Sequence, residues 1–441
     1  MNVCERVETD FSSRLLLQIL SLCCMRRVLI VSYYWPPAGG GGVQRWLKMA
    51  RYLPEHGVET IIYTPANPDY PILDPSLQKD VLLNQEIVKF PIREPYRIFR
   101  RLTGKGSGAV AAGFISEVKG QSRIHRLLGK VRGNFFIPDA RILWVKPSVK
   151  FLLKWLRTNP VDAVITSGPP HSMHLIGLQL KRSIGIKWIA DFRDPWVNMD
   201  NFDLFGMSER ALNRHKKLEA DVLREASEVV TVGWKMSADY EKLRGSNVHV
   251  ITNGYDHEDF EGRKVQKTDR FIIGHYGTFG ADRDAPGLWK ALAELKGKPG
   301  MGSRLLVDLA GATDVHIIES VRNAVGDDCI HYDPWLSHNE IVNRMLNADV
   351  LLVVLNANGN EEHRLTGKVF EYLAAEKPIL GIGSATSDCA RVVGRSGMFF
   401  DRNDAEGIFA FLNSGDFSTC CFANHEQYSR RNLALAFSRL I

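Results

Sequence analysis

A short run of the sequence combines residue types that suit a phosphate group. Gly367 permits close approach of an anion, and Lys368 directly after it adds a positive charge. Thr366 is placed to cap a helix that begins near Lys368, and a helix N-terminus favours anions. Glu371 follows one turn later and can accept hydrogen bonds from hydroxyl groups. The alternative is that Lys368 and Glu371 form a solvated face of an ordinary helix end.

A glycine-rich loop, residues 39–42, joins the predicted first strand to the predicted first helix. Gly40 and Gly41 allow the backbone to approach a ligand, and the helix N-terminus offers N–H groups to an anion. The alternative is a tight strand-to-helix turn. A dinucleotide-binding fingerprint requires G-x-G-x-x-G and an acidic residue after the second strand. The loop has Gln44 in place of the third glycine and the second strand ends in Tyr63-Thr-Pro, which disfavours an NAD-dependent oxidoreductase.

Charged and imidazole side chains follow two further predicted strands. They are Asp191, Arg193 and Asp194 after one strand and His171 and His174 after another. Ligands of open parallel sheets bind beyond the carboxyl ends of the strands, so both groups are candidates for a binding site. The alternative for the first group is a buried Asp–Arg pair that braces a turn. Two histidines without a third ligand nearby favour a core or phosphate contact over zinc.

Two series of elements position these residues. Short apolar runs alternate with amphipathic helical patterns, which predicts parallel sheets with helical crossovers. The first series has strands at residues 28–33, 58–63, 163–166, 187–190 and 229–232 and helices at 147–158, 172–184 and 210–225. The second has strands at residues 271–276, 305–309, 330–332, 350–355 and 379–382 and helices at 288–296, 338–346 and 368–376. The predicted fold class is α/β, with two Rossmann-like doubly wound domains facing a central cleft.

The predicted domain organisation follows from these series. Residues 1–24 are read as an N-terminal extension before a strand that starts after Met25, and a signal peptide is disfavoured because acidic residues outweigh basic ones there. We expect residues 25–250 to form a first domain, which contains the basic segment at residues 91–133, and residues 251–423 to form a second. Residues 424–441 form a terminal helix that either crosses back to the first domain or packs on the second.

Several stretches together resemble glycosyltransferase family 4, whose members have the GT-B fold. They are the loop at residues 39–42, Ser167-Gly-Pro-Pro-His171-Ser-Met-His174, Asp191-Phe-Arg-Asp194-Pro-Trp, Asn253-Gly-Tyr-Asp, His275-Tyr-Gly277-Thr and Thr366-Gly-Lys-Val-Phe-Glu371-Tyr-Leu-Ala. The resemblance extends over residues 25–441. Its most specific part is the last stretch, which holds the donor nucleotide in the family.

The resemblance implies that residues 25–250 form the acceptor-side domain and residues 251–423 the nucleotide-sugar-binding domain. It also implies roles for the candidate residues. Glu371 would accept hydrogen bonds from ribose hydroxyls, and Arg283 would join Lys368 at the diphosphate. The implied donor-binding set is Gly40, Gly41, Asn253, Gly277, Arg283, Thr366, Gly367, Lys368 and Glu371. The implied reaction-centre set is His171, Asp191, Arg193 and Asp194. The family often has a second glutamate eight residues before the ribose-binding one, but this sequence has His363 there, with Glu361 and Glu362 close by.

The resemblance also implies the mechanism. Family 4 members retain the anomeric configuration, so we expect front-face transfer in which the departing diphosphate is stabilised by positive side chains and backbone N–H groups. Asp282-Arg283-Asp284 spells D-x-D, the metal-holding signature of the other major glycosyltransferase fold, but the arginine suits phosphate better than a cation. We therefore expect no metal and no cofactor, since the nucleotide sugar is a substrate.

Composition and charge limit the kinds of partner that the protein can have. The 441 residues contain seven cysteines without a CxxC pair, which favours a reducing cytoplasm. Residues 91–133 hold ten basic and two acidic residues interleaved with apolar ones. This pattern indicates either contact with an anionic membrane or acidic ligand, with a lipid-linked glycan as acceptor, or a solvated insertion. No binding motif for nucleic acid accompanies it.

Two other functions are compatible with the sequence. A nucleotide-sugar epimerase of the same fold would convert the donor without an acceptor. A degenerate transferase would act as a non-catalytic subunit of a glycan-assembly complex, an idea to which the missing second glutamate gives some weight.

Overall fold

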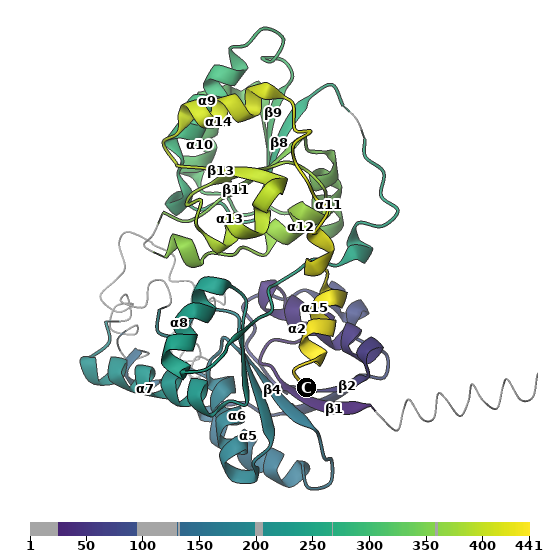
Figure 1. Ribbon diagram of the computed structural model, residues 1–441, viewed down its shortest axis with the longest axis vertical. Helices are drawn as coiled ribbons and strands as arrows, with labels where there is room; N and C mark the ends of the chain where they lie inside the picture. Colours follow the sequence, from purple (N-terminus) through teal and green to yellow (C-terminus); the bar gives the residue numbers. More distant parts are fainter. Residues whose placement is uncertain (1–24, 95–129, 131–132, 199–205, 267, 358–359) are drawn as a thin grey trace, which may run out of the picture. The chain divides into compact units, whose positions relative to one another are not determined.

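The computed structural model describes residues 25–94, 130, 133–198, 206–266, 268–357 and 360–441, which form two compact units (Figure 1). The first unit comprises the chain up to Val232 together with Met236–Ile251 and Leu433–Ile441. The second comprises Gly233–Lys235 and Thr252–Asn432. The predicted extension at residues 1–24 and most of the basic segment at 91–133 lie outside the described residues.

The first unit is built on a parallel seven-stranded sheet. Its order is β3-β2-β1-β4-β5-β6-β7. The strands are β1 (Arg26–Val31), β2 (Val58–Pro65), β3 (Glu86–Phe90), β4 (Ala163–Gly168), β5 (Lys187–Phe192), β6 (Glu228–Thr231) and β7 (His249–Val250). The helices are α2 (Gly41–Tyr52), α5 (Ile142–Trp155), α6 (Ser172–Ile184), α7 (Glu209–Glu225), α8 (Trp234–Arg244) and α15 (Arg430–Ser438).

Both faces of this sheet are covered, as a doubly wound fold requires. Alternate residues of β1 enter two different cores, Leu29 in one and Ile30 in the other. Helices α5, α6, α7 and α8 contribute to the core that contains Leu29, and helices α2 and α15 to the core that contains Ile30. The ring of Phe437 in α15 meets that of Trp46 in α2 edge-on, with 5.1 Å between centroids. The part of α15 from Leu433 onward therefore belongs to the first unit.

The second unit is built on a parallel six-stranded sheet. Its order is β10-β9-β8-β11-β12-β13. The strands are β8 (Phe271–Tyr276), β9 (Leu305–Ala310), β10 (Ile330–Asp333), β11 (Val350–Val354), β12 (Ile379–Ile382) and β13 (Gly397–Phe400). The helices are α9 (Pro286–Lys296), α10 (Val315–Val325), α11 (His338–Asn347), α12 (Lys368–Ala374), α13 (Asp388–Val393) and α14 (Ala405–Ser414). Leu352 and Leu351 of β11 again enter separate cores.

Short 3-10 segments complete the connections. They are Leu53–His56, Pro75–Asp80, His257–Asp259, Ala281–Arg283, Asp327–Cys329, Glu361–His363, Gly394–Ser396 and His425–Tyr428. None of the helices in the described part of the chain combines the length and apolar character needed to cross a bilayer.

The structure differs from the sequence-based prediction at a few elements. Helix α5 starts at Ile142 and contains Pro147, whereas the prediction began the helix at that proline. Pro147 is the sixth residue of α5, so it lies inside the helix, where proline removes one i→i−4 hydrogen bond. Strands β3 and β13 were not predicted. Both are edge strands with partly exposed residues, which lack the continuous apolar run of a buried strand.

Candidate active site

The glycine loop of the first unit leaves the start of α2 open. Gly40 occupies the N-cap position with φ 86° and provides no side-chain cap. Gly40 and Gly41 are exposed, and a Cβ at Gly41 would meet no atom within 4 Å. The first N–H groups of a helix have no intrahelical partner, so this end can receive an anionic group.

Arg193 ties two loops of the first unit together. Its Nη1 donates to the Gly42 carbonyl at 2.8 Å, and its Nη2 donates to the Pro169 carbonyl. A Cβ at Gly42 would lie 2.9 Å from Nη1, so the loop needs glycine there. Burial lowers the pKa of Arg193. Arg193 thus positions the glycine loop against the loop that follows β4.

Asp191 does not face a ligand, which corrects the expectation of a reaction-centre carboxylate. It is fully buried. Its oxygens accept from Arg45 Nη2 at 2.7 Å, from Trp46 Nε1 at 2.8 Å and from Ser167 Oγ at 3.1 Å. A carboxylate enclosed in this way holds α2 and β4 onto β5. The alternative of a buried Asp–Arg pair was right, but its arginine is Arg45.

His171 and His174 form part of a buried aromatic cluster. The His171 ring stacks on Trp196 with 5.0 Å between centroids and 5° between planes. His174 Nδ1 and Thr166 Oγ1 lie 2.9 Å apart. Burial lowers the pKa of His171 to about 4, so its ring is neutral at physiological pH. Among the described residues no group of three or more ligands that could hold a metal ion is found.

Asp194 is the exposed member of the acidic group. Two buried side chains that were not predicted as site residues form hydrogen bonds with the backbone of the loop that carries Asp194. Tyr240 Oη accepts from the Trp196 N–H and donates to Glu219 Oε1, both at 3.1 Å. The Val197 N–H also donates to Glu219. Burial raises the pKa of Glu219. Neither residue stands out in the sequence, because both lie on ordinary amphipathic helices.

In the second unit, Lys368 and Gly277 meet at the carboxyl end of β8. Gly277 has φ 115°, and a Cβ there would lie 3.2 Å from Lys368 Nζ. Lys368 Nζ also lies 2.9 Å from Nε2 of His275, which is 1% exposed and was not a predicted site residue. The structure therefore brings together two predicted donor-binding residues and one unexpected histidine.

Arg283 lies in the same region. Its Nη1 donates to the Thr278 carbonyl at 2.6 Å and its Nε donates to Asn356 Oδ1 at 3.0 Å. The flanking aspartates point to different partners: Asp282 accepts from the Asn356 amide and Asp284 accepts from Trp289 Nε1 at 2.6 Å. The two carboxylates are thus engaged by separate partners, and the predicted phosphate contact of Arg283 stays a prediction.

The cap of α12 differs from the prediction. Gly367, not Thr366, occupies the N-cap position, and no side chain caps the helix. Thr366 Oγ1 is buried without a hydrogen-bond partner within the described ranges. The expected capping role of Thr366 was wrong, because α12 begins one residue too late for its hydroxyl. Gly367 is exposed, and a Cβ there would meet no atom within 4 Å.

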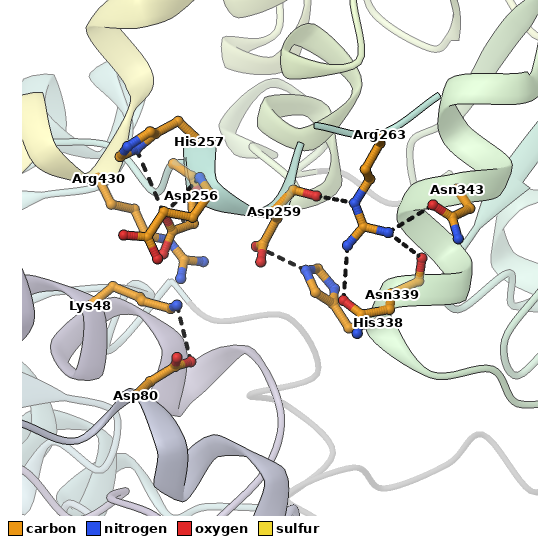
Figure 2. Close-up of polar contacts among 12 residues, drawn as sticks. Lys48, Asp80, Asp256, His257, Asp259, Arg263, His338, Asn339, Asn343 and Arg430 are labelled. Carbon is orange, nitrogen blue, oxygen red and sulfur yellow. Dashed lines mark hydrogen bonds and ion pairs between the residues drawn. The ribbon is translucent and has the colours of Figure 1, made fainter. Parts of the chain in front are cut away.

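Glu371 lies one turn into α12, beside a set of charged groups. His338 Nε2 lies 3.0 Å from Asp259 Oδ2, and Figure 2 shows this contact at the start of α11. Burial raises the pKa of Glu371, whereas His338 and Arg430 oppose the increase. The Glu371 carbonyl accepts from the Ala375 N–H within the helix, but its carboxylate makes no hydrogen bond to another described residue and can accept from a ligand.

Asn253 lies after β7, next to a segment that is bonded to residues 428–430. The Tyr255 N–H donates to the Tyr428 carbonyl, and Arg430 Nε donates to the Gly254 carbonyl, both at 3.2 Å. No hydrogen bond joins Asn253 to Lys368 or Glu371 in the described part of the chain. Its predicted donor contact stays a prediction.

The glutamates near His363 are already engaged. Glu361 accepts from the Ser384 N–H at 3.0 Å and pairs with Arg402 at 3.1 Å. Glu362 pairs with Lys235 at 2.9 Å. His363 itself is exposed. Neither glutamate therefore stands in a free position that would replace the missing second carboxylate.

Solved structures share this architecture. HepE of Anabaena in complex with UDP-glucose aligns with a TM-score of 0.57 at 12% identity, covering 94% of this chain and 98% of that chain. A glycosyltransferase of Rickettsia africae aligns with a TM-score of 0.59 at 13% identity, covering 94% and 97%. Sucrose-phosphate synthase of Thermosynechococcus elongatus aligns with a TM-score of 0.56 at 12% identity, covering 94% and 98%. No curated protein matches the sequence.

The two parallel-sheet units and these similarities define the GT-B fold of glycosyltransferases. The family model described as Glycosyltransferase Family 4 matches residues 39–259, about half of the chain. The chain belongs to glycosyltransferase family 4.

Proposed function

We propose that this protein transfers a sugar from a nucleotide-sugar donor to a glycan or lipid-linked acceptor, with retention of the anomeric configuration. The observation that carries the proposal is the arrangement at α12. Lys368, at the start of the helix, lies against Gly277 and near Arg283, and Glu371 follows one turn later with a carboxylate that makes no hydrogen bond to the described residues. Cations at a helix start suit a diphosphate, and a carboxylate one turn away suits ribose hydroxyls.

The donor class has support from the structural neighbours. One was solved with UDP-glucose and another with UDP-2-fluoro glucose. In the proposed reaction the bond between the anomeric carbon and the diphosphate breaks, and Lys368, Arg283 and the N–H groups of α12 stabilise the departing oxygen. The acceptor hydroxyl attacks the same face and passes its proton to that oxygen. Asp194, exposed in the first unit, is proposed to orient the acceptor hydroxyl.

Thermal unfolding in the presence of nucleotides and nucleotide sugars tests the donor site. Binding to the folded state alone raises the Tm, so the donor should give a selective shift. The shift should vanish in Glu371→Ala and persist in Glu319→Ala, which removes an exposed glutamate from α10 of the same unit. If the protein is folded and none of the nucleotides or nucleotide sugars changes its Tm, the proposal is contradicted. NMR of the anomeric proton of the product tests retention.

We also propose that the acceptor is lipid-linked, as in surface polysaccharide or lipopolysaccharide assembly, and that residues 91–133 contact an anionic membrane. The support is the composition of this segment, with ten basic residues among apolar ones. Co-sedimentation with vesicles tests this. Vesicles that contain phosphatidylglycerol should bind the protein and pure phosphatidylcholine vesicles should not, and equal binding to both would contradict the proposal.

A further inference from the structure

His275 and Lys368 form a direct hydrogen bond in the second unit, and its direction follows from the neighbours. His275 Nδ1 lies 3.0 Å from the Leu352 carbonyl, which can only accept, so Nδ1 carries the proton. Nε2 therefore presents a lone pair, and Lys368 Nζ donates to it at 2.9 Å. The Thr278 carbonyl, 3.4 Å from Nε2, is occupied at 2.6 Å by Arg283 Nη1.

The imidazole holds the amine at a defined place. Lys368 Nζ lies close to the backbone of residue 277, since a Cβ there would be 3.2 Å from it and the amine would have to shift by a few tenths of an ångström. The φ of 115° independently favours glycine. The amine is thus fixed beside the start of α12 by His275 on one side and by the Gly277 backbone on the other.

The charges around Lys368 disfavour the ammonium form in the free protein. Burial is the largest cause, and Arg283 after β8 adds repulsion, so that the pKa of Lys368 falls to about 7. Glu371 on the same helix opposes this decrease. The Cys389 thiol of α13 stays neutral, because burial raises its pKa to about 12. Burial, Lys368 and Arg283 lower the pKa of His275 well below its usual value, so the imidazole is also neutral.

We propose that His275 is a positioning residue for Lys368, and that above neutral pH this pair is largely uncharged in the free protein and takes up one proton when the diphosphate of the donor is bound. The inference rests on the proposed function, because it assigns the diphosphate to Lys368. The proton comes from solvent and stays on the amine, which then donates to both His275 and a phosphate oxygen. No other bond is made or broken.

The uptake of one proton sets the pH dependence of donor binding. Above the pKa of the free amine, affinity should fall by about tenfold for each pH unit until the amine of the complex also deprotonates. Below it, affinity should not depend on this group. A site that used a permanently charged cation would show no such slope.

Calorimetric titration with UDP-glucose, whose diphosphate stays ionised throughout the neutral range, measures the uptake directly. At about pH 8 the heats in buffers of different ionisation enthalpy should show close to one proton taken up per ligand bound, and at about pH 6 nearly none. Lys368→Arg should bind without uptake at either pH, because arginine remains charged. Binding by the wild type without uptake at the higher pH would overturn the proposal, as would unchanged uptake in Lys368→Arg.

Two substitutions test the role of His275. His275→Gln keeps an acceptor at the Nε2 position and should retain both affinity and proton uptake. His275→Leu removes it and should weaken binding by about tenfold, the value of one lost hydrogen bond. Near-ultraviolet circular dichroism checks that both variants are folded. Equal affinities of the two folded variants would refute the positioning role.

The free protein separates failure of this inference from failure of the proposed function. Competitive acetylation followed by mass spectrometry gives the pH midpoint for the reactivity of each lysine. Lys368 should titrate near the pKa of about 7, well below the usual value for lysine, and the exposed Lys150 and Lys154 of α5 serve as reference residues in the same digest. If no nucleotide sugar binds but this midpoint is found, the donor assignment fails and the neutral pair stands. If the pH midpoint of Lys368 equals that of the reference lysines, the uncharged state of the His275–Lys368 pair is refuted.

Discussion

Arg45 and Asp191 form a fully buried ion pair in the first unit, with 2.7 Å between Nη2 and Oδ1. The two residues are 146 positions apart in the sequence. Arg45 Nη2 also donates to the Ile251 carbonyl at 2.9 Å, so the same guanidinium reaches the chain after β7. The pair joins helix α2 to the centre of the sheet.

Asp191→Asn should destabilise the first unit, because it leaves the buried Arg45 guanidinium without its counter-charge. Removal of one partner from a buried pair typically reduces the free energy of unfolding by about 3–5 kcal/mol. Urea denaturation measures the loss. The matched control is Asp194→Asn, an exposed aspartate three positions away, which should change stability by less than about 0.5 kcal/mol. Equal stability of both variants would contradict the structural role of Asp191.

Asp194→Asn should instead reduce turnover. If Asp194 orients the acceptor hydroxyl, its loss should lower kcat by about 10²-fold, the cost of misplacing a reacting group by about 1 Å. Donor binding should remain within a factor of about two, since Asp194 lies in the first unit and the proposed diphosphate contacts lie in the second. Single-turnover kinetics with a bound donor separates the two effects. A loss of donor affinity without a loss of turnover would reject this role.

Lys368→Met should lose donor binding but raise stability. In the wild type, the pKa of Lys368 is about 7 in the folded protein and near its usual higher value in the unfolded chain. Between these values the unfolded state binds more protons, so the stability of the wild type rises with pH. Lys368→Met lacks this dependence. Its advantage in Tm should be clear at neutral pH and shrink as pH approaches about 10.

Lys290→Met, at an exposed position of α9, is the control for Lys368→Met. It should alter neither the Tm nor donor binding. A lower Tm for Lys368→Met at neutral pH would show that the amine stabilises the folded state and would contradict the charges described around it.

Glu219→Gln should become more stable than the wild type as pH rises from acidic to neutral. Burial raises the pKa of Glu219 in the folded protein. The folded state therefore binds more protons than the unfolded state between the two pKa values, and the stability of the wild type falls as pH increases through that window. The Gln amide can still accept from Tyr240 and the Val197 N–H. Urea denaturation at several pH values should show a difference that grows with pH; a difference independent of pH would count against this account.

Most of the fold could be predicted because buried parallel strands are continuous apolar runs. The predicted strands at residues 271–276 and 379–382 coincide with β8 and β12. The edge strands β3 and β13 could not be found this way, because β3 contains charged residues and the apolar run of β13 is only three residues long. The local sequence pattern indicates where a buried strand lies, whereas the formation of an edge strand depends on its pairing with the rest of the sheet.

The candidate site was predictable only where its residues form a motif. The motifs around Lys368 and Gly277 predict that both residues belong to the donor site. His275 belongs to the same run as Gly277, but its role could not be predicted, because a single histidine in an apolar strand resembles any core residue and its partner lies 93 positions away. The same applies to Arg45, whose pairing with Asp191 depends on how α2 packs over the sheet.

The position of α15 has a consequence for the order in which the polypeptide folds during translation. Leu433, Ala434 and Phe437 fill the core of the first unit that α2 covers, yet the ribosome makes them after the whole of Thr252–Asn432. While the second unit is synthesised and folds, the part of the first unit's core that α15 covers therefore remains exposed. A nascent chain stalled before residue 433 should be open to proteolysis around Trp46 and become protected once α15 has emerged.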